Sequence, residues 1–450
     1  MTTTCFRNSN SPSIATGAST RTLGWMERRC RDGLFALLSK LDGELLVVER
    51  FAGGEPVRLG SPTTWPALRS TITLHSPALY VASAIDGHIG AAREWISESW
   101  DCDDLVALMR MFTRSSALGD RLDRRGLGRW FAPLASAAYR WLSRNTRARA
   151  RQHISAHYDL GNDFFAAVLD ETMTYSCALF NAPNTSLAAA QLAKIDTLLA
   201  RLDLSCDQHL LEIGTGWGSL ALRAAERFGC RVTTTTISRR QLEVAKARVV
   251  AAGFADRIDC RADDYRDLVA PPGGFDAIAS VEMIEAVGWQ FLGPYFANVD
   301  RLLKPGGRAV IQAITIEDQR FEQTKRSVDF IKKMVFPGSC IPSVTSLCAA
   351  ATRHSRLRLV QLNDYTEHYV ETLLRWRARL HEQDNLLRAA GYSRELLRLW
   401  DFYLCYCAAG FYERSIGLVH TVWEKSGGPA PSVAIQRRGG VTPASVGCPP

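Results

Sequence analysis

The chain has 450 residues, more than one average domain, with 46% hydrophobic and 22% charged residues. These values exclude a disordered, collagen-like or coiled-coil protein, and no apolar run approaches the ~18 residues of a membrane-spanning helix. The net charge of +8 is compatible with an acidic partner without identifying one. The 12 cysteines show no metal-ligand spacing, so we expect reduced thiols and no metal site.

The first part of the chain predicts a small α+β domain over residues 21–118. Residues 1–20 predict a flexible N-terminus, and the composition of residues 1–26 favours a disordered start over a transit peptide. Within the domain, the expected elements are a helix at Trp25–Leu41, strands at Glu44–Phe51, Pro56–Leu59 and Ser70–Leu74, and a mostly helical stretch at Pro77–Phe112 broken at Asp86-Gly87.

Residues 119–152 are basic and carry interleaved aromatic residues, which predicts a linker with amphipathic helices. From residue 153 to residue 425, strands alternate with helices. The expected strands are His209–Gly214, Arg231–Ile237, Ile258–Arg261, Phe275–Val281 and Arg308–Thr315. This order predicts an α/β fold with a doubly wound, mostly parallel sheet. Residues 426–450 are rich in Gly, Pro and Ser and predict a disordered tail.

A glycine-rich turn follows the first strand of this second domain. Glu212 precedes three glycines at alternate positions, Gly214, Gly216 and Gly218, and a helix is expected directly afterwards. Glycines at a helix N-terminus let backbone amides approach a ligand closely. An acid before the first glycine departs from the dinucleotide fingerprint and suits a ligand with an amine and a hydroxylated sugar. The pattern resembles the S-adenosylmethionine (SAM) loop of class I methyltransferases; a ligand-free turn is the alternative.

The residues at the end of the next predicted strand support the resemblance to methyltransferases and point to one family among them. Most such methyltransferases carry an acid there, whereas this chain has uncharged groups that can bind ribose hydroxyls, namely Thr236, Ile237, Ser238 and Gln241. This segment resembles the cyclopropane-fatty-acyl-phospholipid synthase family. Ser238 alone is also explained as a helix N-cap. The resemblance implies adenine contacts from Asp264 and Tyr265, although a surface position explains Asp264 equally well.

A second segment resembles the same family. His157-Tyr-Asp-Leu-Gly-Asn-Asp-Phe-Phe165 and the later Tyr175-Ser176-Cys177 match the signature that the family places over SAM and the methyl-transfer site. Aromatic faces such as Tyr175 can attract a sulfonium cation or stabilise a carbocation; ordinary core packing is the alternative. The resemblance implies a seven-stranded, Rossmann-like methyltransferase sheet.

The resemblance also implies a base site that holds bicarbonate. Glu285 matches the glutamate that helps to hold this ion, and the other catalytic candidates are Cys177, Ile314, Tyr369 and Gln312. A role of Glu285 as a helix N-terminal acid is the alternative. Gln312 stands where the best-known bacterial synthases have histidine, and glutamine can donate to an oxyanion but cannot shuttle a proton. The segment Phe336–Ser343 resembles a family loop and is expected to form a lipid-side wall.

The implied reaction is methyl transfer from SAM to a cis double bond of a phospholipid acyl chain, giving a cyclopropane through a carbocation that bicarbonate deprotonates. A methylene-branched product, a soluble methyl acceptor and a non-catalytic lipid-binding protein are the alternatives. The 90–105 segment resembles the family's lipid-presenting domain. We expect a cytoplasmic enzyme at the inner membrane surface, docked on anionic lipids through residues 119–152, without nucleic acid; a homodimer is left open.

Overall fold

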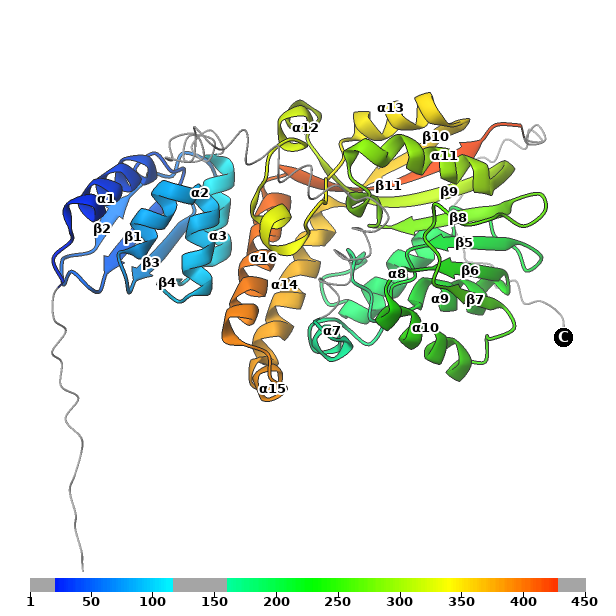
Figure 1. Cartoon of the computed structure of the whole chain (residues 1–450), viewed down its shortest axis with the longest axis horizontal. Helices are drawn as coiled ribbons and strands as arrows, with labels where there is room; N and C mark the ends of the chain where they lie inside the picture. The colour runs from blue at the N-terminus through cyan, green and yellow to red at the C-terminus, as the bar shows by residue number, and fades with distance from the viewer. Residues whose placement is uncertain (1–20, 116–159, 428–450) are drawn as a thin grey trace, which may run out of the picture.

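The computed structural model describes residues 21–115 and 160–427, which form two sheets with a helical pair between them (Figure 1). The expected flexible start and basic linker lie outside the described residues, as do residues 428–450 of the expected disordered tail and the domain boundaries at 118 and 152. In the described parts of the chain, no helix is long and apolar enough to cross a membrane.

The N-terminal region is a four-stranded sheet in the order β2-β1-β3-β4, covered by helices. Its elements are α1 (Trp25–Leu38), β1 (Glu44–Glu49), β2 (Val57–Leu59), β3 (Arg69–Leu74), α2 (Ala78–Ile96), β4 (Trp100–Cys102) and α3 (Leu105–Arg114). The first two predicted strands correspond to β1 and β2, which pair antiparallel as a hairpin. Gly87 breaks α2 with a φ of 57°, as expected from the sequence. The expectation of a mostly helical stretch to Phe112 was wrong at β4, which is too short to show a periodicity.

The second sheet has seven strands in the order β10-β11-β9-β8-β5-β6-β7. Five are the predicted ones: β5 (His209–Ile213), β6 (Arg231–Thr235), β7 (Ile258–Arg261), β8 (Phe275–Val281) and β9 (Leu303–Ile316). The remaining two, β10 (Leu357–Asp364) and β11 (Ile416–Lys425), pair antiparallel with each other, and β11 pairs antiparallel with β9. The sheet is therefore mostly parallel with an antiparallel edge, and the predicted α/β architecture is confirmed.

Helices flank this sheet on both faces. Those after the strands are α9 (Ser219–Phe228), α10 (Arg239–Ala251), α11 (Leu292–Leu302) and α13 (Val344–His354). Shorter or preceding segments are α7 (Asn162–Val168), α8 (Leu187–Leu199), η2 (Ile284–Ala286), η3 (Trp289–Phe291), α12 (Asp318–Thr324) and the π-helical turn η4 (Ile331–Val335). The buried apolar residues of the longer helices pack with those of the strands in two core clusters.

Helices α14 (Thr366–Glu382) and α16 (Arg394–Tyr412) stand between the two sheets, and the short α15 (Asp384–Ala389) lies at the end of this pair (Figure 1). Helix α16 packs on α14 on one side and on α2 and α3 on the other. Arg398 of α16 donates to the carbonyl of Trp95 at 2.6 Å, and its guanidinium lies 4.0 Å from the centroid of that indole ring. The N-terminal region is thus attached to the larger one through α16.

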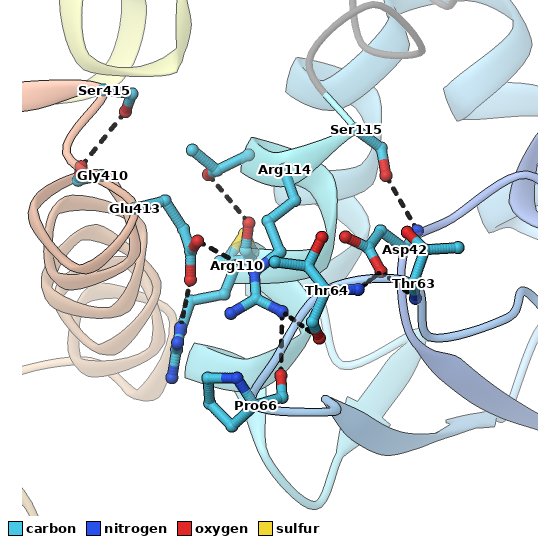
Figure 2. Close-up of polar contacts among 12 residues, drawn as sticks. Asp42, Thr63, Thr64, Pro66, Arg110, Arg114, Ser115, Gly410, Glu413 and Ser415 are labelled. Carbon is cyan, nitrogen blue, oxygen red and sulfur yellow. Dashed lines mark hydrogen bonds and ion pairs between the residues drawn. The ribbon is translucent and has the colours of Figure 1, made fainter.

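Two arginines that share one carboxylate complete this attachment (Figure 2). Glu413, at the end of α16, accepts from Arg110 Nε at 2.6 Å and from Arg114 Nε at 2.8 Å, both on α3. Arg114 also donates to the carbonyl of Pro66 at 2.9 Å. The Arg114 and Glu413 side chains are only 7% and 13% exposed, so removal of one partner would leave a shielded charge unpaired.

Candidate active site

A cavity of about 810 Å³ runs from the carboxyl edge of the seven-stranded sheet into the N-terminal region. The glycine-rich turn, Thr236 and Asp264 line one end of it. Glu282, Glu285 and Tyr369 line its middle. The far end is apolar and belongs to the N-terminal region, with side chains such as Leu38, Ile72 and Met109. One continuous space therefore joins the predicted cofactor loop, a group of carboxylates and an apolar chamber.

The glycine-rich turn has the backbone that its sequence predicts. Gly214 and Gly216 have φ values of 103° and 52°, in the region that glycine favours. A Cβ atom on Gly216 would meet nothing within 4 Å, so this backbone faces open cavity. Gly218 does not line the cavity, and a Cβ atom there would lie 3.3 Å from the Cβ of Ala245 on α10. The third glycine therefore permits close helix packing.

Glu212 lies beneath this turn and is buried. Its carboxyl accepts a hydrogen bond of 2.6 Å from Thr234, and burial raises its pKa to about 8. Lys194, buried and also on the cavity wall, donates to Ser176 Oγ at 2.7 Å, and burial lowers its pKa to about 8. Both groups titrate near neutrality, so binding of a cation at this end is coupled to their protonation.

The predicted ribose and adenine contacts divide into cavity residues and supporting residues. Thr236, Ile237 and Gln241 line the cavity, and Thr236 donates to the Gln241 amide oxygen at 3.0 Å. Ser238 does not line the cavity; it caps α10, which is the structural alternative that the sequence left open. Asp264 and Tyr265 both line the cavity, and Asp264 is buried and paired with Arg266 at 2.5 Å. A surface position for Asp264 was therefore the wrong alternative.

The aromatic signature segment packs against the cofactor turn. Trp217 of the turn donates to Asn162 at 2.9 Å, and its ring centroid lies 5.1 Å from that of Phe165. Tyr175 lines the cavity, and its hydroxyl is 3.0 Å from that of Tyr403. Ser176 is the buried partner of Lys194. Residues 157–159 of the signature lie outside the described part of the chain.

Three of the side chains or amides expected to hold bicarbonate converge instead on Glu282, which was not among the residues predicted from the sequence. Its carboxylate accepts hydrogen bonds from the backbone N–H of Cys177 at 2.9 Å, from Gln312 Nε2 at 2.7 Å and from the Tyr369 hydroxyl. Three of the five predicted catalytic residues therefore meet on one side chain. Cys177 and Gln312 do not line the cavity, so they act on it through Glu282. Burial raises the pKa of Glu282, while these three hydrogen bonds oppose the rise.

A contact with His420 fixes the orientation of the Gln312 side-chain amide. His420 Nε2 lies 2.9 Å from the Gln312 amide oxygen, and burial lowers the pKa of His420 to about 2. A neutral imidazole that donates through Nε2 fixes the amide so that its NH₂ group faces Glu282. The sheet supplies this arrangement, because β9 pairs with β11 at Gln312↔His420.

Glu285 occupies a different environment from Glu282. Its side chain is buried and accepts from the backbone N–H of Ile314, and its Oε2 atom has no hydrogen-bond partner among the described residues. Burial and the neighbouring Glu282 raise its pKa to about 8. The three donors to Glu282 favour its charged form, whereas Glu285 has a single backbone donor, so we place the negative charge of the pair on Glu282.

Comparison with known proteins decides the family. The family model described as mycolic acid cyclopropane synthetase matches residues 145–421. The chain belongs to this family. Tuberculostearic acid methyltransferase UfaA1 of Mycobacterium tuberculosis is 39% identical over 349 residues, which cover 76% of this chain and 80% of that protein. The cyclopropane-fatty-acyl-phospholipid synthase of Escherichia coli K12 is 30% identical over 355 residues, covering 79% and 87%.

Solved structures of cyclopropane synthases agree with this assignment. The synthase MmaA2 from M. tuberculosis aligns with a TM-score of 0.57 and 27% identity, covering 61% of this chain and 98% of that one. The mycolic acid cyclopropane synthase CmaA1, solved with S-adenosylhomocysteine, aligns with a TM-score of 0.57 and 28% identity over 61% and 98%. The fold is therefore that of a Rossmann-like methyltransferase, and this chain is a SAM-dependent methyltransferase. The residues at the cofactor end fit SAM, since an open glycine backbone and a buried acid suit its sulfonium and amine.

Two functional candidates, Glu282 and Lys194, were not predicted from the sequence. A local signal for Glu282 existed, because it and Glu285 follow β8 three residues apart, at the edge where ligands bind in such sheets. No comparable signal marked Lys194, which lies on a helix and becomes significant only because packing buries it.

Proposed function

We propose that this enzyme transfers the methyl group of SAM to a cis double bond in an unsaturated phospholipid acyl chain. The observation that carries the proposal is the single cavity that joins the cofactor loop to an apolar chamber in the N-terminal region. A soluble polar substrate does not require such a chamber. An acyl chain fits it, because its tail is apolar and its double bond can lie beside the carboxylates.

The two ends of the cavity have separate roles in this chemistry. When bound, SAM supplies an electrophilic methyl group. The alkene π electrons bond to the methyl carbon as the carbon–sulfur bond breaks, which leaves a carbocation on the neighbouring chain carbon. An alkene is a weak nucleophile, so alignment of the two reactants contributes much of the rate. Tyr175 and Tyr369, on the cavity wall, offer aromatic faces to cationic groups.

Loss of one proton then decides the product. If the added methyl group loses it directly, the carbon–hydrogen electrons close a cyclopropane ring. If a hydride first shifts between the two former alkene carbons, loss of a methyl proton gives a methylene branch. The resemblance predicts the ring. The branched product is the second candidate, since the relative that is 39% identical is named a methyltransferase. Bicarbonate as the base is the prediction that the resemblance supplies.

The proposal extends to a membrane surface. A phospholipid substrate requires the enzyme to dock on a bilayer, and the basic residues 119–152 provide charges that anionic lipids attract. Docking at the inner face of a cytoplasmic membrane would leave SAM accessible from the cytosol. Vesicle flotation with and without anionic lipid measures this binding directly.

The test of the proposed function uses the full-length protein, SAM and vesicles of a cis-monounsaturated phosphatidylglycerol. We expect the acyl chains to gain one CH₂ unit by mass spectrometry, with high-field ring protons in the proton NMR spectrum for a cyclopropane or vinylidene protons for a methylene branch. Vesicles of the saturated lipid are the control and should stay unmodified. Intact SAM binding without any modified acyl chain contradicts the proposal and directs the search to soluble acceptors.

A further inference from the structure

We propose that Glu282 is the built-in base of this enzyme and that its carboxylate takes the place of a bicarbonate ion. The inference rests on the proposed methyl transfer and deepens it, because it names the group that receives the proton. It also departs from the resemblance, which implies that bicarbonate fills this role.

The hydrogen-bond donors of the expected bicarbonate site are already in use. The resemblance assigns the ion to Glu285, Cys177, Gln312, Ile314 and Tyr369. In the structure, Cys177 N–H, Gln312 Nε2 and the Tyr369 hydroxyl all donate to Glu282. The Ile314 N–H donates to Glu285. These donors form a binding site for an oxyanion. Carboxyl groups of the chain itself, chiefly that of Glu282, already occupy this site.

Charge gives a second reason against an additional ion. Burial and the nearby Glu282 carboxylate both disfavour ionisation of Glu285 and raise its pKa to about 8. Bicarbonate would add a further negative charge without any of the four donors named above. Lys194 is the only buried ammonium that offsets Glu282 among the described residues, and it is already hydrogen-bonded to Ser176. Bicarbonate therefore does not fit the site as it is built.

The backbone at Glu282 indicates that its position is enforced. Its φ is 48°, in the left-handed region that a residue with a long side chain rarely adopts. Its N–H donates to the carbonyl of Gln312 at 2.9 Å, and β8 pairs with β9 at Val281↔Gln312. The same strand neighbour therefore fixes both the main chain and the carboxylate of Glu282. Strain of this kind is usually kept where it positions a functional side chain.

The proton balance is simple. Glu282 lines the cavity, and its Oε2 atom accepts one hydrogen bond, from Tyr369, which leaves a lone pair for a proton. A carbon–hydrogen bond of the methylated chain breaks, its electrons form the new carbon–carbon bond, and Oε2 takes the proton. Glu282 becomes neutral as the carbocation is discharged. The proton then leaves to solvent before the next turnover, so the step needs no further reagent.

Two substitutions at this residue separate the hypotheses. Glu282→Gln keeps the shape and fills the site but removes the base. Glu282→Gly removes the side chain, opens a space for a small oxyanion and suits the positive φ, so its backbone is not strained. Glu285→Gln is the matched control, because it alters the neighbouring carboxyl group and leaves the Glu282 donors in place.

The first experiment measures bicarbonate binding by equilibrium dialysis of [¹⁴C]bicarbonate and by thermal unfolding, and it does not depend on turnover. We expect wild type, Glu282→Gln and Glu285→Gln to show no saturable binding and no thermal shift. Glu282→Gly should bind the ion and unfold at a higher temperature in its presence. Saturable binding to wild type, or none to a folded Glu282→Gly, overturns the inference.

The second experiment measures acyl-chain modification by the same proteins. We expect Glu282→Gln to be inactive with or without bicarbonate, and Glu282→Gly to become at least tenfold more active when bicarbonate is added. A Glu282→Gln protein that stays active at the wild-type rate overturns the inference. An inactive wild type that binds SAM contradicts the proposed function instead, and the binding experiment still decides whether Glu282 holds the bicarbonate position.

Discussion

The two working ends of the cavity are built in different ways. The cofactor end consists of short continuous motifs, each following its own strand: the glycine turn after β5, Thr236 and Ile237 after β6, and Asp264 after β7. The base site joins single residues from four distant segments, Cys177, Glu282, Gln312 and Tyr369. The first can be recognised along the chain, whereas the second exists only once β8 and β9 are in register.

This difference explains which residue roles can be inferred from a family resemblance. A motif carries its own neighbours, so the shape of the cofactor loop follows from its sequence. A site assembled across strands can change its chemistry through one residue that belongs to no motif. Glu282 is such a residue: its three donors, Cys177, Gln312 and Tyr369, were expected at one site and lie together in the structure, but the group that receives their hydrogen bonds was not expected.

The largest expected effect is at Glu282. Glu282→Gln should lower kcat by about a thousandfold, within the range that general-base groups contribute. The Kd for SAM should stay unchanged, because the glycine turn is not altered. Single-turnover kinetics and calorimetric SAM titration measure the two quantities. A loss of SAM affinity comparable to the loss of kcat would show that the two ends of the cavity are not independent.

A smaller effect is expected at Tyr369. Tyr369→Phe removes one hydrogen bond to the Glu282 carboxylate and should lower kcat roughly tenfold. Loss of a donor to the charged form also raises the pKa of Glu282 further. Since the base acts when ionised, the acid limb of the pH–rate profile should move to higher pH. An unshifted limb with reduced kcat would mean that Tyr369 contributes packing alone.

The cofactor end should show its own pH dependence. The pKa values of Glu212 and Lys194 are both near 8 before ligand binding. As pH rises through 8, Glu212 gains a negative charge and Lys194 loses its positive charge, so affinity for a sulfonium ligand should rise. Glu212→Gln should weaken SAM binding about tenfold at pH 8.5 and reduce this dependence. Calorimetric titration of wild type and Glu212→Gln at each pH measures the Kd for SAM. Ionisation of the amine of SAM affects both proteins equally, so the difference between them reports on Glu212.

The smallest effect on the chemistry is expected at the contact between the two regions. Glu413→Gln removes the charge that pairs with Arg110 and Arg114 (Figure 2). We expect a loss of about 2 kcal/mol in the free energy of unfolding. The KM for vesicles should rise a few-fold, because the apolar chamber is less firmly held, while SAM affinity stays constant. Urea denaturation measures the free energy of unfolding, and steady-state kinetics measure KM. An unchanged KM would show that the attachment of the apolar chamber does not affect substrate binding.

Much of the fold was predictable because strands with apolar or β-branched residues alternate with helices and are separated by clear turns. The five parallel strands were assigned from this pattern. Strand β10 was missed because it is an edge strand with mostly exposed residues, and β11 because buried polar residues such as His420 interrupt its apolar run. The extension of the cavity into the N-terminal region was not predictable either. It results from how α16 packs between the two sheets, which no local pattern encodes.

The most direct test of the central claim is the rate of acyl-chain modification by the wild-type enzyme in buffer freed of carbon dioxide. The rate is then measured again in the same buffer after bicarbonate is added. If Glu282 is the base, the two rates should be equal within error. A rate that falls to near zero without bicarbonate and rises again with its concentration would contradict the account. It would show that bicarbonate, and not Glu282, accepts the proton.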